Sequence, residues 1–374
     1  MNIRKSLIEK AIVDQDRNAS QRQREAGENY FKAIQGDRKA MEWLVEGIST
    51  SDVPALLTPA LNVQFLAQYA EQPIVWNQIA EEYTSSTLDN VEFGSFTFDS
   101  SDLIGVHDGD EYVGAGLPGV AEYGEYPAVK YTTEQLEAKL RKNGVRFRFS
   151  WEAQMKARNF DHIALSTAQF ARYAAEQEDV TLAKQFVSTA GVINTGFTDL
   201  ALNPALDLES LQAAKAAARN VVVDGRRVSA RDFALVVGSA LVDRADDILS
   251  VRTVERTDGS DVYTIAPRNS DVSVVNFWAL EQVGGSATPG TTDDYWFLVP
   301  RGGARAAFLE VFLEGYRTPL ISVKDSGHFS ISGGAIPARE GRFEDDSIET
   351  RGRHVVEATA LTPELVIASD GSGS

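Results

Sequence analysis

Four histidines are the residues best suited to metal binding or acid–base chemistry: His107, His162, His328 and His354. None of them has a second histidine three or four residues away, and the sequence contains no H-E-x-x-H, so the spacing of a helical zinc site is absent. The chain has no cysteine, which excludes thiol catalysis, disulfides and cysteine-ligated metals. The sequence therefore predicts no metal, no cofactor and no catalytic residue. An enzyme with a composite active site, built from residues distant in the sequence, stays open as an alternative.

Two glycine-rich segments match the letters of known motifs but lack their context. Residues 114–119 match G-x-G-x-x-G, which binds dinucleotides where it joins a strand to a helix. Here Pro118 lies inside the match and no helical pattern follows it, so we interpret the segment as a loop tip. Residues 301–305 resemble an RGG segment, but a single copy between strand-like segments predicts a turn.

Charge is distributed unevenly along the chain. Residues 40–129 contain fifteen acidic residues and no Lys or Arg, whereas residues 130–158 contain eight basic residues against three acidic ones. The spacing of the densest acidic cluster is not that of a calcium-binding EF-hand loop, and we interpret it as a solvated charged loop. The cluster consists of Asp99, Asp102, Asp108, Asp110 and Glu111.

The overall balance excludes further classes of function. The formal net charge is −18 and the pI is near 4.7, which argues against a protein whose main surface grips nucleic-acid phosphates. No apolar run approaches the roughly 20 residues that cross a bilayer, and residues 1–5 lead into a polar stretch unlike a secretory signal. We expect a protein without a membrane partner.

The elements that carry these charges can be predicted from hydrophobic periodicity. Residues 91–98 and 144–150 alternate between apolar and polar side chains, as half-buried strands do, and a long acidic segment lies between them. We interpret residues 91–150 as an extended two-stranded arm with an acidic tip and a basic base. In the second strand, Arg146 and Arg148 share one face and the aromatic residues share the other.

The remainder predicts an α+β fold. Residues 161–187 contain neither Pro nor Gly and keep helical spacing, which indicates a helix about 40 Å long. Residues 206–315 have a mixed α/β pattern, with Asp207 expected to cap the first helix. Within them, residues 306–314 are apolar with an alternating character. Residues 319–368 are rich in strand-like segments, and residues 369–374 indicate a flexible end.

This order of elements resembles the major capsid proteins of tailed bacteriophages with the Hong Kong 97-type fold. The resemblance rests on the arm, the long helix with its Glu178-Asp179 run, and the strands near residues 351–354 and 362–366. It implies five regions: an N-terminal arm with helices (1–90), an extended E-loop (91–150), the P-domain spine helix with a connector (151–205), an A-domain (206–315), and the returning P-domain strands with a flexible tail (316–374).

The resemblance also implies function and partners. It implies a structural protein, not an enzyme, that forms hexamers and pentamers of an icosahedral shell around double-stranded DNA, which it does not bind specifically. Scaffold, portal and cement proteins are the other partners implied, and the location is the virion capsid, assembled in the host cytoplasm. An encapsulin-like nanocompartment shell is the alternative with the same fold.

Two consequences concern how copies would be joined. Some family members crosslink a loop lysine to a P-domain asparagine, but residues 319–374 contain no Asn, so that bond is not supported here. We therefore expect a non-covalent shell. The candidate intersubunit contacts are the acidic arm tip on one copy and the basic strand on its neighbour: Asp99, Asp102, Asp108, Asp110, Glu111, Arg146 and Arg148. Pairing of the two arginines within one subunit is the competing interpretation.

Overall fold

The computed structural model describes residues 68–69, 71–98, 131–156, 162–223, 226–227, 230–251, 253–258, 261–265, 269–301, 306–324, 327, 331 and 341–373. The chain forms two compact units, each assembled from three separated segments. The first unit comprises Met1–Ile74, Arg141–Glu178 and Phe312–Val356, and the second comprises Val75–Leu140, Asp179–Val311 and Glu357–Ser374. Helices and sheets occur in both, so the fold is mixed, as the sequence predicts.

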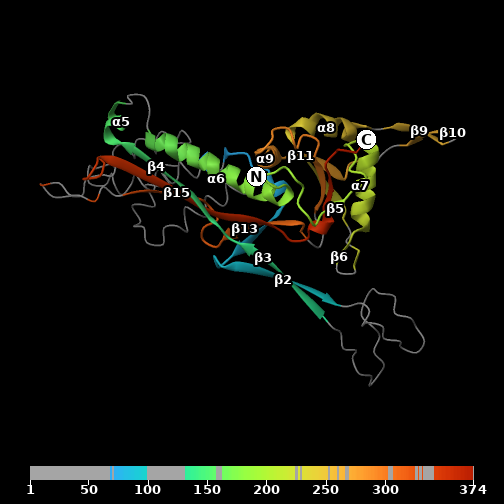
Figure 1. Ribbon diagram of the computed structural model, residues 1–374, viewed down its shortest axis with the longest axis horizontal. Coiled ribbons are helices and arrows are strands. Elements are labelled where there is room, and N and C mark those ends of the chain that lie inside the picture. The colour runs from blue at the N-terminus through green and yellow to red at the C-terminus, as the bar shows by residue number, and fades with distance from the viewer. Residues whose placement is uncertain are drawn as a thin grey trace, which may run out of the picture. The chain divides into compact units, whose positions relative to one another are not determined.

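The first unit pairs a small sheet with one long helix (Figure 1). The 25-residue helix α6 confirms the prediction of a long helix, and it begins in this unit. The central strand β15 pairs antiparallel with β4 on one side and with β14 on the other. The elements are β4 (Lys142–Ser150), α5 (Trp151–Lys156), α6 (His162–Phe186), β14 (Leu320–Val323) and β15 (Ser347–Ala360).

Small residues allow α6 to lie close to this sheet. Phe170, Ala171, Ala174 and Ala175 of α6 are buried together with Tyr69 and Ile321. Gly352 of β15 lies under the Phe170 ring, because a Cβ atom built on this glycine would come within 2.4 Å of three ring carbons. The sheet is therefore covered by the helix on one face, while the other face carries the polar residues of β4, β14 and β15.

The second unit has a sheet that is buried far more completely. Its strand order is β11-β8-β12-β16-β5, in which β8 and β11 are parallel while β12 runs antiparallel to β8 and β16. Helix α7 begins at a capping box in which Asp207 accepts a hydrogen bond from Ser210, as predicted. The elements around this sheet are β5 (Thr198–Asp199), α7 (Leu208–Asn220), β8 (Asp232–Val237), η2 (Ser239–Leu241), α8 (Val242–Ser250), β11 (Val272–Asn276), α9 (Ala279–Gly284), β12 (Trp296–Arg301), η4 (Pro363–Leu365) and β16 (Ile367–Ser369).

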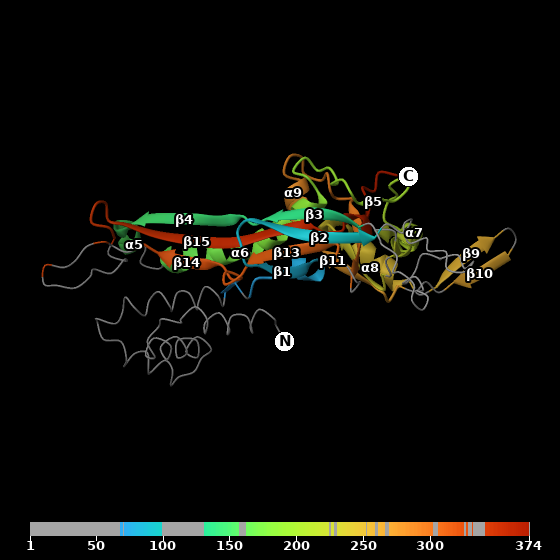
Figure 2. The ribbon, with the colours of Figure 1, turned by 90° about the horizontal axis from the view of Figure 1, so that it is seen from below.

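Three two-stranded sheets complete the second unit. These are the antiparallel pairs β2–β3, β9–β10 and β6–β7, of which the first two are seen in Figures 1 and 2. Strand β1 is hydrogen-bonded to β13. The bounds are η1 (Trp76–Gln78), β1 (Glu81–Ser85), β2 (Asn90–Phe98), β3 (Tyr131–Lys139), β6 (Val222–Val223), β7 (Arg226–Arg227), β9 (Val254–Asp258), β10 (Asp261–Ile265) and β13 (Phe308–Leu313).

The structure corrects the predicted return strand of the arm. Strand β2 pairs with β3 from Asn90↔Lys139 to Phe98↔Tyr131, not with residues 144–150. Residues 144–150 instead lie in β4 and pair with β15. Residues 144–150 do alternate in polarity, but alternation identifies a strand without identifying its partner.

The structure also corrects three predictions about single elements. Strand β13 is buried on both faces, so the expected alternation of 306–314 is wrong for Phe308–Leu313. Strand β16 pairs with β12 and β5 in the second unit's sheet, apart from the other C-terminal strands. The prediction of a flexible end is wrong for residues 369–373, because Ser369 Oγ donates to the Pro204 carbonyl at 2.8 Å and the Gly373 N–H donates to Asn203 at 2.8 Å.

Candidate functional site

The solvent face of the β4–β15–β14 sheet gathers charged side chains because strand residues alternate between faces. On β15, the residues Ile348, Thr350, Gly352 and His354 are buried toward α6. The alternate residues Glu349, Arg351 and Arg353 therefore lie on the opposite face. Lys142, Arg146 and Arg148 lie on the same face of β4, which confirms that the two arginines share a face opposite the aromatic residues.

The strand register arranges this face in rows that cross all three strands. In the first row, Glu349 lies between Arg148 and Lys324, whose backbone N–H donates to the Glu349 carbonyl at 2.9 Å. In the second row, Arg351 lies between Arg146 and Ser322. The third row places Arg353 between Gly144 and Leu320, and in the fourth Val355 lies opposite Lys142.

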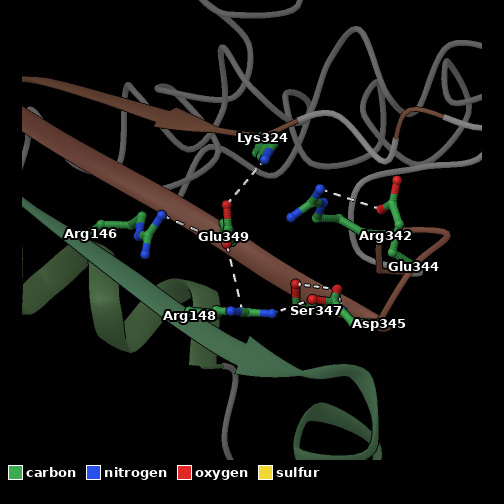
Figure 3. A network of polar contacts seen from close by, with 8 residues as sticks. All are labelled: Arg146, Arg148, Lys324, Arg342, Glu344, Asp345, Ser347 and Glu349. Atoms are coloured by element: carbon green, nitrogen blue, oxygen red, sulfur yellow. Dashed lines mark hydrogen bonds and ion pairs between the residues drawn. The ribbon is translucent and has the colours of Figure 1, made fainter.

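The first row is close to electrically balanced (Figure 3). Glu349 is only 7% exposed, and its Oε1 lies 3.6 Å from Arg148 Nε while its Oε2 lies 3.5 Å from Lys324 Nζ. Arg148 also forms an ion pair with Asp345. Two cations therefore meet two carboxylates. A separate pair, Arg342–Glu344, lies 3.3 Å apart beside them.

Asp345 is fixed by hydrogen bonds more than by the ion pair. The Ser347 hydroxyl donates to its Oδ1 at 2.7 Å, and the Ser347 backbone N–H donates to the same atom at 3.1 Å. These bonds lower the pKa of Asp345 below its ordinary value of 3.8, and the positive charges of Arg148 and Arg342 lower it further. The carboxylate is therefore the preferred form of Asp345.

The second row carries positive charge without an acid of its own. Arg146 and Arg351 are directly opposite each other in the register, and Arg146 is 65% exposed. The nearest carboxylate to Arg146 is that of Glu349 in the first row, at 4.0 Å. Among the described residues Arg351 has no ion pair. Rows two to four together hold four basic residues and no acidic one: Lys142, Arg146, Arg351 and Arg353.

The predicted site residues can now be compared with the structure. Arg146 and Arg148 lie on the exposed face and pair with acids of the same chain, most closely for Arg148. Asp99, Asp102, Asp108, Asp110 and Glu111 lie outside the described residues. Sequence reasoning missed Lys324, Asp345, Glu349, Arg351 and Arg353. The period-two spacing of Glu349, Arg351 and Arg353 was a usable signal for a common face, but not for its position beside β4.

The adjacent residues Glu178 and Asp179 of α6 have buried carboxylates, and each accepts hydrogen bonds within its own unit. In the first unit, Glu178 accepts a hydrogen bond from the Tyr69 hydroxyl, and its Oε1 lies 3.0 Å from His354 Nε2 and 3.8 Å from Arg317 Nη1. In the second unit, Asp179 accepts from the backbone N–H groups of Val75 and Trp76 at 3.0 and 2.9 Å. Each buried carboxylate thus holds the segment that precedes β1, which makes them structural groups.

One family model matches the sequence, and several solved structures are similar to the chain. A model of the family described as phage capsid protein matches residues 133–368. Similar solved structures include the capsid of Myoviridae phage XM1 (10% identity, TM-score 0.47, covering 79% of this chain and 91% of that one) and the capsid of cyanophage P-SCSP1u (11%, 0.46, 79% and 88%). A virus-like particle from Pyrococcus furiosus is similar at 10% identity (TM-score 0.42, 84% and 99%). No curated protein matches the sequence.

The family match covers more than half of the chain, from β3 to β16, and includes α6, the second unit's central sheet and the charged face. Among the described residues, no helix is long and apolar enough to cross a membrane. The chain belongs to the phage capsid protein family, and its function is that of a phage capsid protein.

Proposed function

We propose that this capsid protein has the Hong Kong 97-type fold and assembles into hexamers and pentamers of an icosahedral shell around double-stranded DNA. In this proposal, β2, β3 and the acidic segment between them are the E-loop. The sheet and helix of the first unit are the P-domain, and the sheet β11-β8-β12-β16-β5 is the core of the A-domain. The shell is a non-enzymatic container assembled in the host cytoplasm, with scaffold, portal and cement proteins as partners.

The observation that carries this proposal is the two-stranded sheet β2–β3. Nine consecutive residue pairs join the two strands, and no third strand flanks them among the described residues. An isolated pair of strands is marginally stable in water and needs a surface to pack on. A neighbouring copy in a shell supplies that surface. The phage capsid family favours this assembly over the alternative, an encapsulin-like compartment.

The sharpest test removes the segment between the two strands and leaves their pairing intact. Phe98 and Tyr131 are directly paired, so a two-residue Asn-Gly turn can replace residues 99–130 and close a regular hairpin. We expect the full chain to form megadalton particles by light scattering and electron microscopy. The shortened chain should keep its circular dichroism spectrum and stay unassembled.

Salt should increase the yield of particles from the full chain. Each copy carries −18, and the repulsion between copies falls off over roughly 8–10 Å at physiological ionic strength. The negative charge of the chain also repels DNA phosphates, which lets DNA move inside the shell without specific binding. A full chain that stays monomeric at every salt concentration, with or without scaffold proteins, would overturn the proposal, as would normal assembly of the shortened chain.

We also propose that the acidic tip, Asp99, Asp102, Asp108, Asp110 and Glu111, contacts the basic strand of a neighbouring copy. The exposure of Arg146 supports this contact, and the ion pairs of Arg148 with Asp345 and Glu349 support the competing pairing within one subunit. The double variant R146E with R148E tests which of these two pairings the arginines make. A folded subunit that no longer assembles supports the contact, and a normal particle yield contradicts it.

A further inference from the structure

The charged face of the first unit contains two arginine positions with different electrostatic surroundings. Arg148 already has Asp345 and Glu349 as partners. Arg146 and Arg351 face each other across β4 and β15, and like charges directly opposite in a sheet are destabilising. A carboxylate between them would remove this repulsion, because a guanidinium offers paired donors that match a carboxylate.

The neighbouring row extends the same positive surface. Arg353 follows Arg351 by two residues on the same face, and its guanidinium carbon lies 5.0 Å from the centre of the Tyr316 ring. This contact holds the side chain near one position. The residue opposite Arg353 is Gly144, so no side chain from β4 competes for the space beside it.

We infer that Arg146 and Arg351, extended by Arg353, form a binding site for two carboxylates of an extended acidic segment from a second copy of this chain. The inference rests on the proposed function, because the ligand is a segment of another capsid subunit. It assigns the contact to the second and third rows and gives Arg148 a structural role within its own subunit.

The spacing of acids in the sequence selects the segment. Residues two apart on an extended strand project from one face roughly 6.6–6.8 Å apart, which is also the spacing of Arg351 and Arg353 along β15. Within the acidic tip, Asp108 and Asp110 are two residues apart and have only Gly109 between them. When bound in extended form, their carboxylates match the two rows, whereas Asp99 and Asp102 are three apart and fall on opposite faces.

Binding is measured with a fluorescent peptide of residues 99–126 and the dilute full-length chain at low ionic strength, where the net charge keeps copies apart. We expect the double variant R146Q with R351Q to weaken peptide binding about 10-fold or more, since two charge-assisted contacts are lost. R172Q, which removes one positive charge of the same unit, is the control, because Arg172 is an exposed cation on α6 that pairs with Glu176. It should change binding less than about twofold.

The peptide supplies a second matched comparison. A peptide with D108N and D110N should bind more weakly, by a factor similar to that of the arginine variant. A peptide with D99N and D102N loses the same charge and should lose clearly less affinity. Equal losses for both peptides, or for R172Q and the double variant, would overturn the site. Short duplex DNA that binds more tightly than the peptide and depends on Arg146 and Arg351 would overturn the choice of ligand.

The test distinguishes failure of the proposed binding site from failure of the proposed shell function. Specific peptide binding by a chain that never assembles would leave the carboxylate site standing and contradict the shell. Normal shells together with unchanged peptide binding by the arginine variant would leave the shell standing and contradict the site.

Discussion

The two principal sheets of this protein differ in how many of their faces are buried. In the second unit, β8, β12 and β16 are covered on both faces, and they have runs of buried residues such as Phe233–Val237. In the first unit, β15 has one face on α6 and one in solvent, and its buried residues alternate with charged ones along much of its length. The buried runs of the two-sided sheet leave little room for charged side chains, and the charged rows described above lie on the one-sided sheet.

The largest expected effect tests the fully buried sheet. Phe297 of β12 has no exposed area, and its ring centre lies 4.9 Å from that of Phe186. We expect F297A to reduce the free energy of unfolding by about 3–5 kcal/mol, because it removes buried area and leaves a cavity. Denaturant unfolding followed by near-ultraviolet circular dichroism measures the change. V222A is the control, because Val222 is more than half exposed. If F297A lowered the free energy of unfolding by less than about 1 kcal/mol, the result would contradict a rigid core covered on both faces.

An intermediate effect is expected on the buried face of the one-sided sheet. Adding a methyl group at Gly352 forces it against the Phe170 ring, so G352A should destabilise the first unit by about 1–3 kcal/mol. Thermal unfolding measures it. S322A, in the adjacent strand on the solvent face, should be close to neutral. Equal stability of the two variants would show that α6 does not pack as closely as the structure indicates.

The smallest effect concerns the solvent face and depends on pH. The pKa of Asp345 is lowered by the Ser347 hydrogen bonds and then by Arg148, so its contribution to stability is complete well above the ordinary value of 3.8. The contribution is lost as the pH falls through the lower pKa of the folded state. Carboxyl NMR should show Asp345 titrating at a pH below the ordinary value of 3.8, and S347A should move its pKa upward. A carboxyl that titrates at the ordinary value in both proteins would contradict the network.

Much of the fold could be predicted from local patterns. The helix from His162, the Asp207 cap and the strand-rich character of residues 319–368 all follow from periodicity or end signals within a few residues. The partners of the strands could not be predicted in the same way. The alternating segment at 144–150 fits equally well beside β2 or beside β15, because alternation defines a face and says nothing about register with a distant strand.

The candidate site shows the same division. The sequence alone determined that the chain is acidic, that residues 130–158 are rich in basic residues after a long stretch without any, and that Arg146 and Arg148 lie on one face. Tertiary structure decided which of these arginines are already neutralised. Asp345 and Glu349 come from about 200 residues further along the chain and reach Arg148, while the same strand brings Arg351 opposite Arg146. Charge balance at a point depends on all the groups within a few ångströms, and only the folded chain brings such groups together.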